Sequence, residues 1–205
     1  MKNNSIKSSK IFELAQFQFK SEKPIQEFIS KISIGPNDTV LEIGPGSGRI
    51  TQVLAPLCKE VIAIEIDIAH KDVLNNLIQR APNLKILWQD FLNFPLPPTP
   101  YKIVANIPFN QTRNILEKII TAENIPEVLC LILQSEVSEK ICRAENEHTL
   151  LSAYIQNFYQ LKVINNFQRS DYQPPAHVDT VALLMEAKKE IPVIDKAEFF
   201  RFIST

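Results

Sequence analysis

The chain uses almost no glycine outside one short stretch. It contains four glycines. All of them lie between Gly35 and Gly48, and Gly44, Gly46 and Gly48 fall in the sequence TVLEIGPGSG, where the apolar run 39–43 predicts a buried strand. Glycine has no Cβ, so a turn built from it can adopt positive φ and lie against another molecule. A helix that begins at such a turn points its free N–H groups into the same space. The stretch therefore indicates a strand–turn–helix unit that binds a ligand.

A carboxylate further along the chain narrows the choice of ligand. Glu65 ends a second apolar run, VIAIEID, and lies 21 residues after Gly44. Nucleotide-binding folds place an acidic residue about 20 residues on, where it holds ribose hydroxyls. The glycines read E-x-G-x-G-x-G and not G-x-G-x-x-G, because Arg49 stands at the third glycine position. This spacing disfavours NAD and FAD and favours S-adenosylmethionine (SAM), which has a ribose but no pyrophosphate.

Composition bounds the class of protein. The chain has 205 residues, of which 45% are hydrophobic, which is enough for one domain with a packed core. A net charge of −1 argues against an extensive basic surface for binding nucleic acid. The N-terminal segment is locally basic, and it is either a solvated tail or an RNA contact.

Other features concern location and metals. The three cysteines have no metal-ligand spacing and indicate a reducing compartment, and the histidines are scattered. We find no apolar run of about 18 residues and no secretory signal pattern. We therefore expect a cytoplasmic protein with no metal and no membrane segment.

Apolar periodicity predicts alternating strands and helices. Strands are expected at 39–43, 61–66, 84–88, 101–105, 128–133 and 178–185. Helices are expected at 21–33, after the glycine turn, near 73–78, near 115–120 and at 195–203, and Ser21 is expected to cap the first of them. Residues 150–167 are expected to form a helix followed by a strand, and residues 172–175 an extended loop. This alternation predicts an α/β fold with a mostly parallel sheet and right-handed crossovers.

Ligands of such sheets bind outside the carboxyl ends of the strands. Gly44, Glu65, Asp90 and Asn106 each follow or close a predicted strand, so we expect them along one rim. The sequence Asn106-Ile107-Pro108-Phe109 adds amide and carbonyl acceptors and a flat aromatic face at that rim. Acceptors for two N–H bonds beside a stacking ring would suit an adenine held by its exocyclic amine.

The ordered set of motifs resembles a known family. VLEIGPGSGRIT, VIAIEID, QDFLNF, KIVANIPFN, LILQSEVSEK and YQPPAHVDT, between about Ala15 and Met185, resemble the rRNA adenine N6-dimethyltransferases, which include the KsgA and Erm enzymes. The resemblance implies a Rossmann-like SAM-dependent methyltransferase fold with a mostly parallel seven-stranded sheet and helices on both faces. It also implies an N-terminal arm or cofactor lid at 1–20, a catalytic domain at 21–187, and at 188–205 a remnant or start of a C-terminal helical domain.

The resemblance assigns roles to individual residues. Asn106 and Pro108 would orient the target amine, while Phe109 and Tyr172 would stack on the two faces of a base flipped out of RNA. The cofactor contacts would be the glycines of the turn, Glu65 on the ribose, Ile66 and Asp90 on the cofactor's adenine, and further residues of the lid and rim; the full set is Phe17, Phe19, Gly44, Gly46, Gly48, Glu65, Ile66, Asp90 and Asn106.

The chain also departs from the family pattern. Phe17 stands where the family's Q-N-F-L motif has asparagine, and Phe19 stands where it has leucine. Ala176 replaces the second proline of the late motif F-x-P-x-P-x-V. About twenty residues follow the last predicted strand, so most of the family's C-terminal helical domain has no counterpart in this sequence.

The expected function is transfer of methyl groups from SAM to adenine N6 of ribosomal RNA, by a monomer. KIVANIPFN and LILQSEV favour the Erm type, hence 23S rRNA and antibiotic resistance, with a KsgA-like 16S target as the alternative. Two other classes stay open: a SAM-dependent small-molecule or lipid methyltransferase, and an RNA-binding relative without catalysis.

Overall fold

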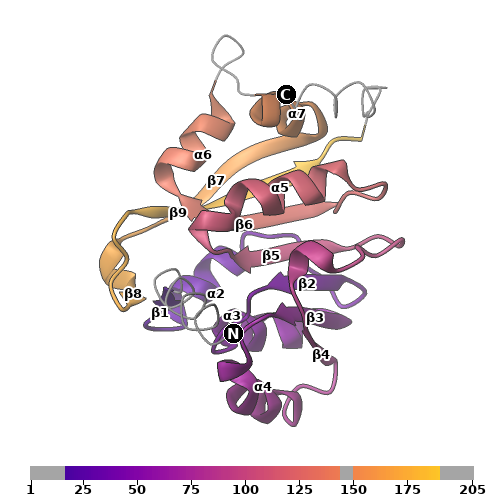
Figure 1. The fold of residues 1–205 in the computed structure, drawn as a ribbon, viewed down its shortest axis with the longest axis vertical. Helices are drawn as coiled ribbons and strands as arrows, with labels where there is room; N and C mark the ends of the chain where they lie inside the picture. The colour runs from indigo at the N-terminus through magenta and orange to yellow at the C-terminus, as the bar shows by residue number, and fades with distance from the viewer. Residues whose placement is uncertain (1–16, 144–149, 190–205) are drawn as a thin grey trace, which may run out of the picture.

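A computed structural model describes residues 17–143 and 150–189 of the chain. Its centre is a seven-stranded sheet with the order β4-β3-β2-β5-β6-β9-β7 (Figure 1). The strands are β2 (Thr39–Ile43), β3 (Glu60–Glu65), β4 (Leu84–Trp88), β5 (Lys102–Asn106), β6 (Val128–Gln134), β7 (Tyr159–Phe167) and β9 (Thr180–Ala187). The first five run parallel, while β9 pairs antiparallel with both β6 and β7. The predicted mostly parallel, seven-stranded sheet is confirmed.

Helices cover both faces of this sheet. They are α2 (Lys23–Ile29), α3 (Arg49–Leu54), α4 (Lys71–Ile78), α5 (Thr112–Thr121), α6 (Ser135–Cys142) and α7 (Leu150–Phe158). Successive strand residues point to opposite faces. Val40 accordingly packs into a core with α2 and α3, and Leu41 packs into a second core with α5 and α7. Both residues are fully buried, which explains why the central strands are mostly apolar on both faces.

The element boundaries differ from the sequence prediction at the N-terminal helix. The helix begins at Lys23 with Glu22 at its N-cap, and Pro24 stands in the first turn. Proline suits that position, because the N–H groups of the first turn have no partner within a helix. The prediction of Ser21 as the cap was wrong, and the helix ends at Ile29, earlier than expected.

A two-stranded sheet was not predicted. β1 (Gln18–Phe19) pairs antiparallel with β8 (Tyr172–Gln173), in the stretch that the sequence predicts as an extended loop. Lys20 N–H also donates to the carbonyl of Asp171 at 2.8 Å. The pairing ties β1 to the loop region that precedes β9.

The predicted helix and strand within 150–167 are confirmed as α7 and β7. The helix predicted at 195–203 lies outside the described residues. The division of the chain into an arm, a catalytic domain and a C-terminal remnant stays a prediction.

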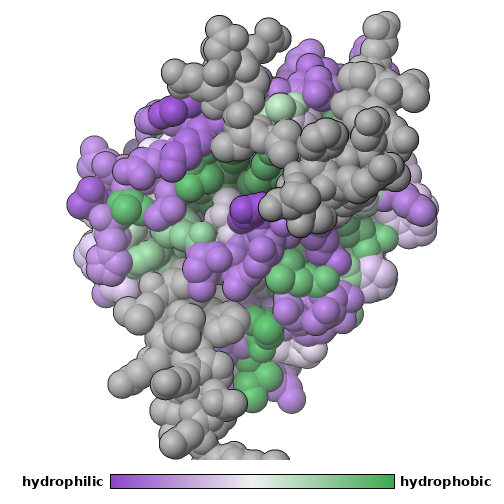
Figure 2. Space-filling model, turned by 45° about the horizontal axis from the view of Figure 1, so that its top comes forward, coloured by the Kyte–Doolittle hydropathy of each residue, from purple (hydrophilic) through white to green (hydrophobic). Residues whose placement is uncertain are grey.

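The surface of the described residues is mixed in character. On the face shown in Figure 2, polar surface separates the apolar surface into several patches. Within 17–143 and 150–189, no helix has the length and apolarity that a membrane crossing requires.

Candidate active site

The glycine turn joins β2 to α3, and its three glycines all have positive φ. The values are 63° at Gly44, 56° at Gly46 and 76° at Gly48. A Cβ built on Gly44 would meet no atom within 4 Å, so this glycine borders open space. A Cβ on Gly48 would lie 2.8 Å from a methyl carbon of Leu77. Gly48 therefore lets α4 approach the turn, and it does not line the pocket that the other two glycines border.

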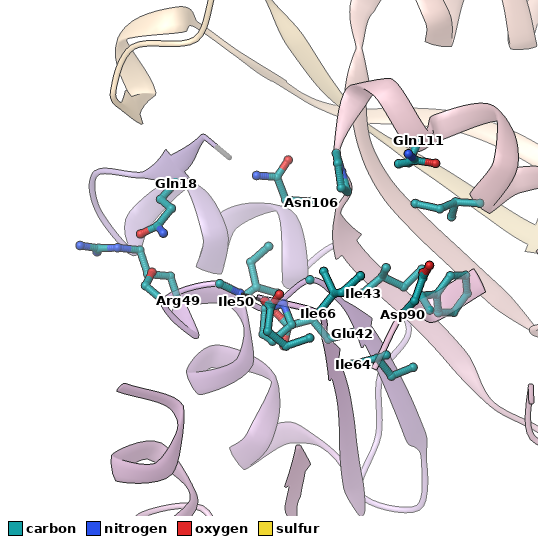
Figure 3. A pocket seen from close by; sticks show the side chains of 18 of the residues that line it. Gln18, Glu42, Ile43, Arg49, Ile50, Ile64, Ile66, Asp90, Asn106 and Gln111 are labelled. Carbon is teal, nitrogen blue, oxygen red and sulfur yellow. Dashed lines mark hydrogen bonds between the residues drawn. The ribbon is translucent and has the colours of Figure 1, made fainter. Parts of the chain in front are cut away.

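A pocket opens at the carboxyl ends of β2, β3, β4 and β5 (Figure 3). The predicted rim is found there, since Gly44, Glu65, Asp90 and Asn106 all line this one pocket. The structure places further predicted site residues on its wall, namely Phe17, Phe19, Gly46, Ile66 and Pro108. Gly48, Phe109 and Tyr172 are not among its lining residues.

Glu65 is held by the backbone on both carboxylate oxygens. Oε2 accepts from Gly46 N–H at 2.9 Å and Oε1 accepts from Asp67 N–H at 2.8 Å. The carboxylate is buried, and each oxygen keeps a lone pair for a further donor. The arrangement fits a ribose, which would present two hydroxyl donors to a fixed carboxylate.

Asp90 is oriented in a similar way at the end of β4. Its Oδ1 accepts from Leu92 N–H at 2.8 Å, while the side chain stays half-buried on the pocket wall. Ile66 is 45% exposed beside it, an unusual position for a large apolar side chain at the end of a buried strand. An adenine ring would cover Ile66 and offer an amino donor to Asp90.

Glu42 is a pocket residue that the sequence analysis did not single out. It lies in β2, is 1% exposed, and its Oε2 has no hydrogen-bond partner. Burial, together with the nearby charge of Glu65, raises the pKa of Glu42 to about 8. A buried acceptor without a partner fits a cationic ligand group, such as the sulfonium or ammonium group of SAM. The signal in the sequence was an acidic residue inside an otherwise apolar strand.

Asn106 closes β5 and faces the N-terminal segment. Its Nδ2 donates to the backbone carbonyl of Phe17 at 2.8 Å. Its Oδ1 is buried and has no hydrogen-bond partner. One acceptor of Asn106 is thus free for an incoming N–H group.

Tyr172 lies deeper than its expected role requires. It is fully buried, and its hydroxyl forms a 2.6 Å hydrogen bond with Thr180 Oγ1. Phe19 stacks on its ring, with centroids 4.7 Å apart and planes 30° apart. In this conformation Tyr172 presents no exposed face to a base, because Phe17 and Phe19 cover it.

The lining residues that the sequence analysis did not single out include two glutamines. Gln18, between Phe17 and Phe19 in the sequence, has its Nε2 3.6 Å from the position of a Cβ on Gly46. Gln111 lies just after the Asn-Ile-Pro-Phe turn, and its Oε1 accepts from Asn114 Nδ2 at 2.9 Å. Neither residue had a sequence signal, because glutamine is ordinary in solvated loops. Within the described parts of the chain, no group of three His, Cys, Asp or Glu side chains is placed to hold a metal ion.

Comparison with known proteins agrees with this geometry. The family described as ribosomal RNA adenine dimethylase matches residues 8–205. The chain belongs to this family. Relatives include the ribosomal RNA small subunit methyltransferase A of Nostoc sp., 31% identical over 93% of this chain and 76% of the relative. Another is an rRNA adenine N-6-methyltransferase of Bacteroides fragilis, 33% identical over 88% of this chain and 68% of the relative.

Solved structures give the same family. The 23S rRNA methyltransferase ErmE is similar with a TM-score of 0.77 and 25% identity, over 91% of this chain and 75% of that chain. A dimethyladenosine transferase from Plasmodium falciparum is similar with a TM-score of 0.76 and 26% identity. The similarity covers 83% of this chain and 63% of the length of the Plasmodium protein. The Rossmann-like methyltransferase fold expected from the sequence is confirmed.

Proposed function

We propose that this protein transfers methyl groups from SAM to the N6 atom of an adenine in ribosomal RNA. The observation that carries the proposal is Asn106. It stands at the end of β5, on the wall of the pocket that Glu65 and Asp90 also line, with a buried Oδ1 that has no hydrogen-bond partner. The names of the relatives, which are rRNA methyltransferases, support the same substrate class.

Three carboxylates would hold the cofactor. Glu65 would accept from the ribose hydroxyls, Asp90 from the adenine amino group, and Glu42 would face the cationic end. When bound, SAM supplies an activated methyl group on a sulfonium centre. Gly44 leaves the open space against which that ligand would lie.

At the target adenine, the residues of the protein would act by positioning the N6 amino group. Asn106 Oδ1 would accept one N6 proton, and the carbonyls of the turn that Pro108 shapes would accept the other. The ring of Phe109 is half-buried at this turn and would stack on the base. Holding two reactants in line can lower a barrier by roughly 7–11 kcal/mol, and preorganised acceptors add electrostatic stabilisation.

The 23S rRNA is the target within this proposal, and resistance to antibiotics would follow from that target. The motifs KIVANIPFN and LILQSEV support it. Relatives of both kinds match at similar identity, 31% for a small-subunit enzyme and 33% for an adenine N-6-methyltransferase, so the 16S rRNA is the alternative. A cytoplasmic monomer is part of the same proposal.

Substitution of Asn106 tests the proposal. Asn106→Ala should reduce methyl transfer to rRNA by at least 100-fold, while calorimetry still detects SAM binding. Asn106→Asp is the matched control, since it keeps an acceptor but loses the donor to Phe17, and it should retain more transfer than the alanine variant. Undiminished transfer by Asn106→Ala would contradict the proposal. Binding of SAM without transfer to any rRNA by the unaltered protein would favour a non-catalytic relative.

A further inference from the structure

The ring of Phe17, whose backbone contacts Asn106, is surrounded by the ring side chains of three other residues. The Phe17 ring centroid lies 5.8 Å from that of Phe109, with the planes 32° apart. His177 and Tyr172 approach the same ring edge-on, at 5.5 Å and 6.3 Å. Phe17 is only 8% exposed. The Phe17 ring therefore contacts both of the residues expected to stack on a target base, Phe109 and Tyr172.

The backbone of Phe17 also contacts the polar side chain of Asn106. Its carbonyl accepts the Asn106 Nδ2 proton at 2.8 Å. The Oδ1 atom of Asn106 is shielded from solvent yet has no partner. The Phe17 backbone therefore lies against the same side chain that would accept the amino group of a target base.

The strand pairing that holds this segment is short. β1 consists of Gln18 and Phe19, and its pairing with β8 covers two residue pairs. Segments with few hydrogen bonds open locally at much lower free energy than the core of a domain. The packing of Phe19 on Tyr172 also stabilises the position of β1. Because β1 is not part of the seven-stranded sheet, displacement of Phe17 would not require that sheet to unfold.

We propose that the Phe17 ring occupies the seat of the target adenine, so that Phe17 and the incoming base compete for one position. This inference rests on the proposed function, adenine N6-methylation, and deepens it by assigning a residue that sets how readily the base enters. The apparent affinity for the base is then the intrinsic affinity multiplied by the fraction of molecules in which Phe17 is displaced. The contact is particular to this chain in one respect, because the family pattern has asparagine where Phe17 stands.

Titration with adenosine 5′-monophosphate tests the competition. The protein is first saturated with S-adenosylhomocysteine, so that the nucleotide reports on the target seat and not on the cofactor pocket. Phe17→Asn, which restores the residue of the family pattern, should bind the nucleotide at least 10-fold more tightly than the unaltered protein, and Phe17→Leu should lie between them. Phe109→Ala should weaken nucleotide binding in either background. Equal or weaker binding by a folded Phe17→Asn variant would overturn the inference.

A measurement on the unaltered protein avoids any effect of substitution on folding. Nuclear Overhauser contacts between the Phe17 and His177 rings should be present without nucleotide and should disappear when adenosine 5′-monophosphate saturates the protein. Persistence of these contacts at saturation would refute the competition. Transfer of methyl groups to rRNA is measured in parallel. Displacement of Phe17 without any transfer would refute the proposed function and leave the competition standing, whereas transfer with persistent ring contacts would do the reverse.

Discussion

The backbone N–H of Gly46 donates to Glu65 Oε2 over 2.9 Å, which joins the glycine turn after β2 to the end of β3. The second oxygen of Glu65 accepts from Asp67 N–H. The two backbone N–H donors together require that both side-chain oxygens of Glu65 act as hydrogen-bond acceptors. The carboxylate is thus fixed by the fold before a ribose reaches it.

Glu65→Gln should weaken SAM binding by roughly 10- to 100-fold. The amide would turn a donor toward one of two backbone N–H groups, and hydrogen bonds to a charged group are worth about 1.5–3 kcal/mol. Calorimetric titration measures the change. Glu65→Asp keeps the charge on a shorter side chain and should lose less affinity than Glu65→Gln. Equal affinity in all three proteins would exclude a role for Glu65 in binding.

Gly48→Ala should lower the free energy of unfolding by roughly 2–4 kcal/mol, since it combines a left-handed backbone with overpacking. The new Cβ would lie 2.8 Å from Leu77 and 3.2 Å from Leu74, at a φ of 76°. Chemical denaturation measures the loss. Gly35→Ala is the control, because its Cβ would make ordinary contact at 3.8 Å, and it should change stability far less. A fully stable Gly48→Ala protein would show that α4 can move away without cost.

Glu42 should make stability depend on pH. Its pKa is raised from the ordinary value of 4.5 to about 8 in the folded protein, so between these values the unfolded chain has lost a proton that the folded chain retains. The contribution of this group to the free energy of unfolding is therefore full below about 4.5, falls as pH rises, and is gone above about 8. Glu42→Gln should flatten this slope in denaturation curves recorded from pH 5 to 8. An identical slope in both proteins would contradict the raised pKa.

The same carboxyl should couple SAM binding to pH. A cationic ligand group beside Glu42 favours the ionised carboxylate and lowers its pKa, so binding should release a proton near neutral pH. Calorimetry in buffers of different ionisation enthalpy measures this proton, and Glu42→Gln should reduce the number released. No difference between the two proteins would place the cationic end of the ligand elsewhere.

Tyr172→Phe should cost about 1–3 kcal/mol of stability, the usual penalty for a buried group that loses its partner. The hydroxyl of Tyr172 is bonded to the fully buried Thr180. Thermal unfolding measures the loss, and Thr180→Val in the same background should restore part of it. Since the aromatic ring is retained, methyl transfer at temperatures well below unfolding should persist; its abolition would give the hydroxyl a role that its burial does not suggest.

The rim of the pocket was predictable because it depends on topology alone. Glu65 and Asn106 each end a strand and Asp90 follows the end of β4, and parallel strands bring their carboxyl ends together. The contacts of Phe17 were not predictable, because its partner Asn106 is 89 residues away and the pairing depends on how β1 meets β8.

The glycines of one motif also differ in their structural roles. Gly44 borders open space, whereas Gly48 accommodates the side chains of α4. Sequence spacing could not separate these roles, since α4 begins more than twenty residues later and its approach is a matter of tertiary packing. The burial of Tyr172 under Phe19 likewise depends on a strand pair only two residues long.

The most direct test of adenine N6-methylation is transfer of labelled methyl from SAM to protein-free 23S and 16S rRNA, assayed side by side and followed by nucleoside analysis. Label is expected in N6-methylated adenosine from the 23S rRNA, and at least 100-fold less of it with Asn106→Ala. Label only in the 16S rRNA would contradict the choice of target and retain the reaction. Label in another nucleoside, or none in either RNA while SAM binds, would contradict the central claim.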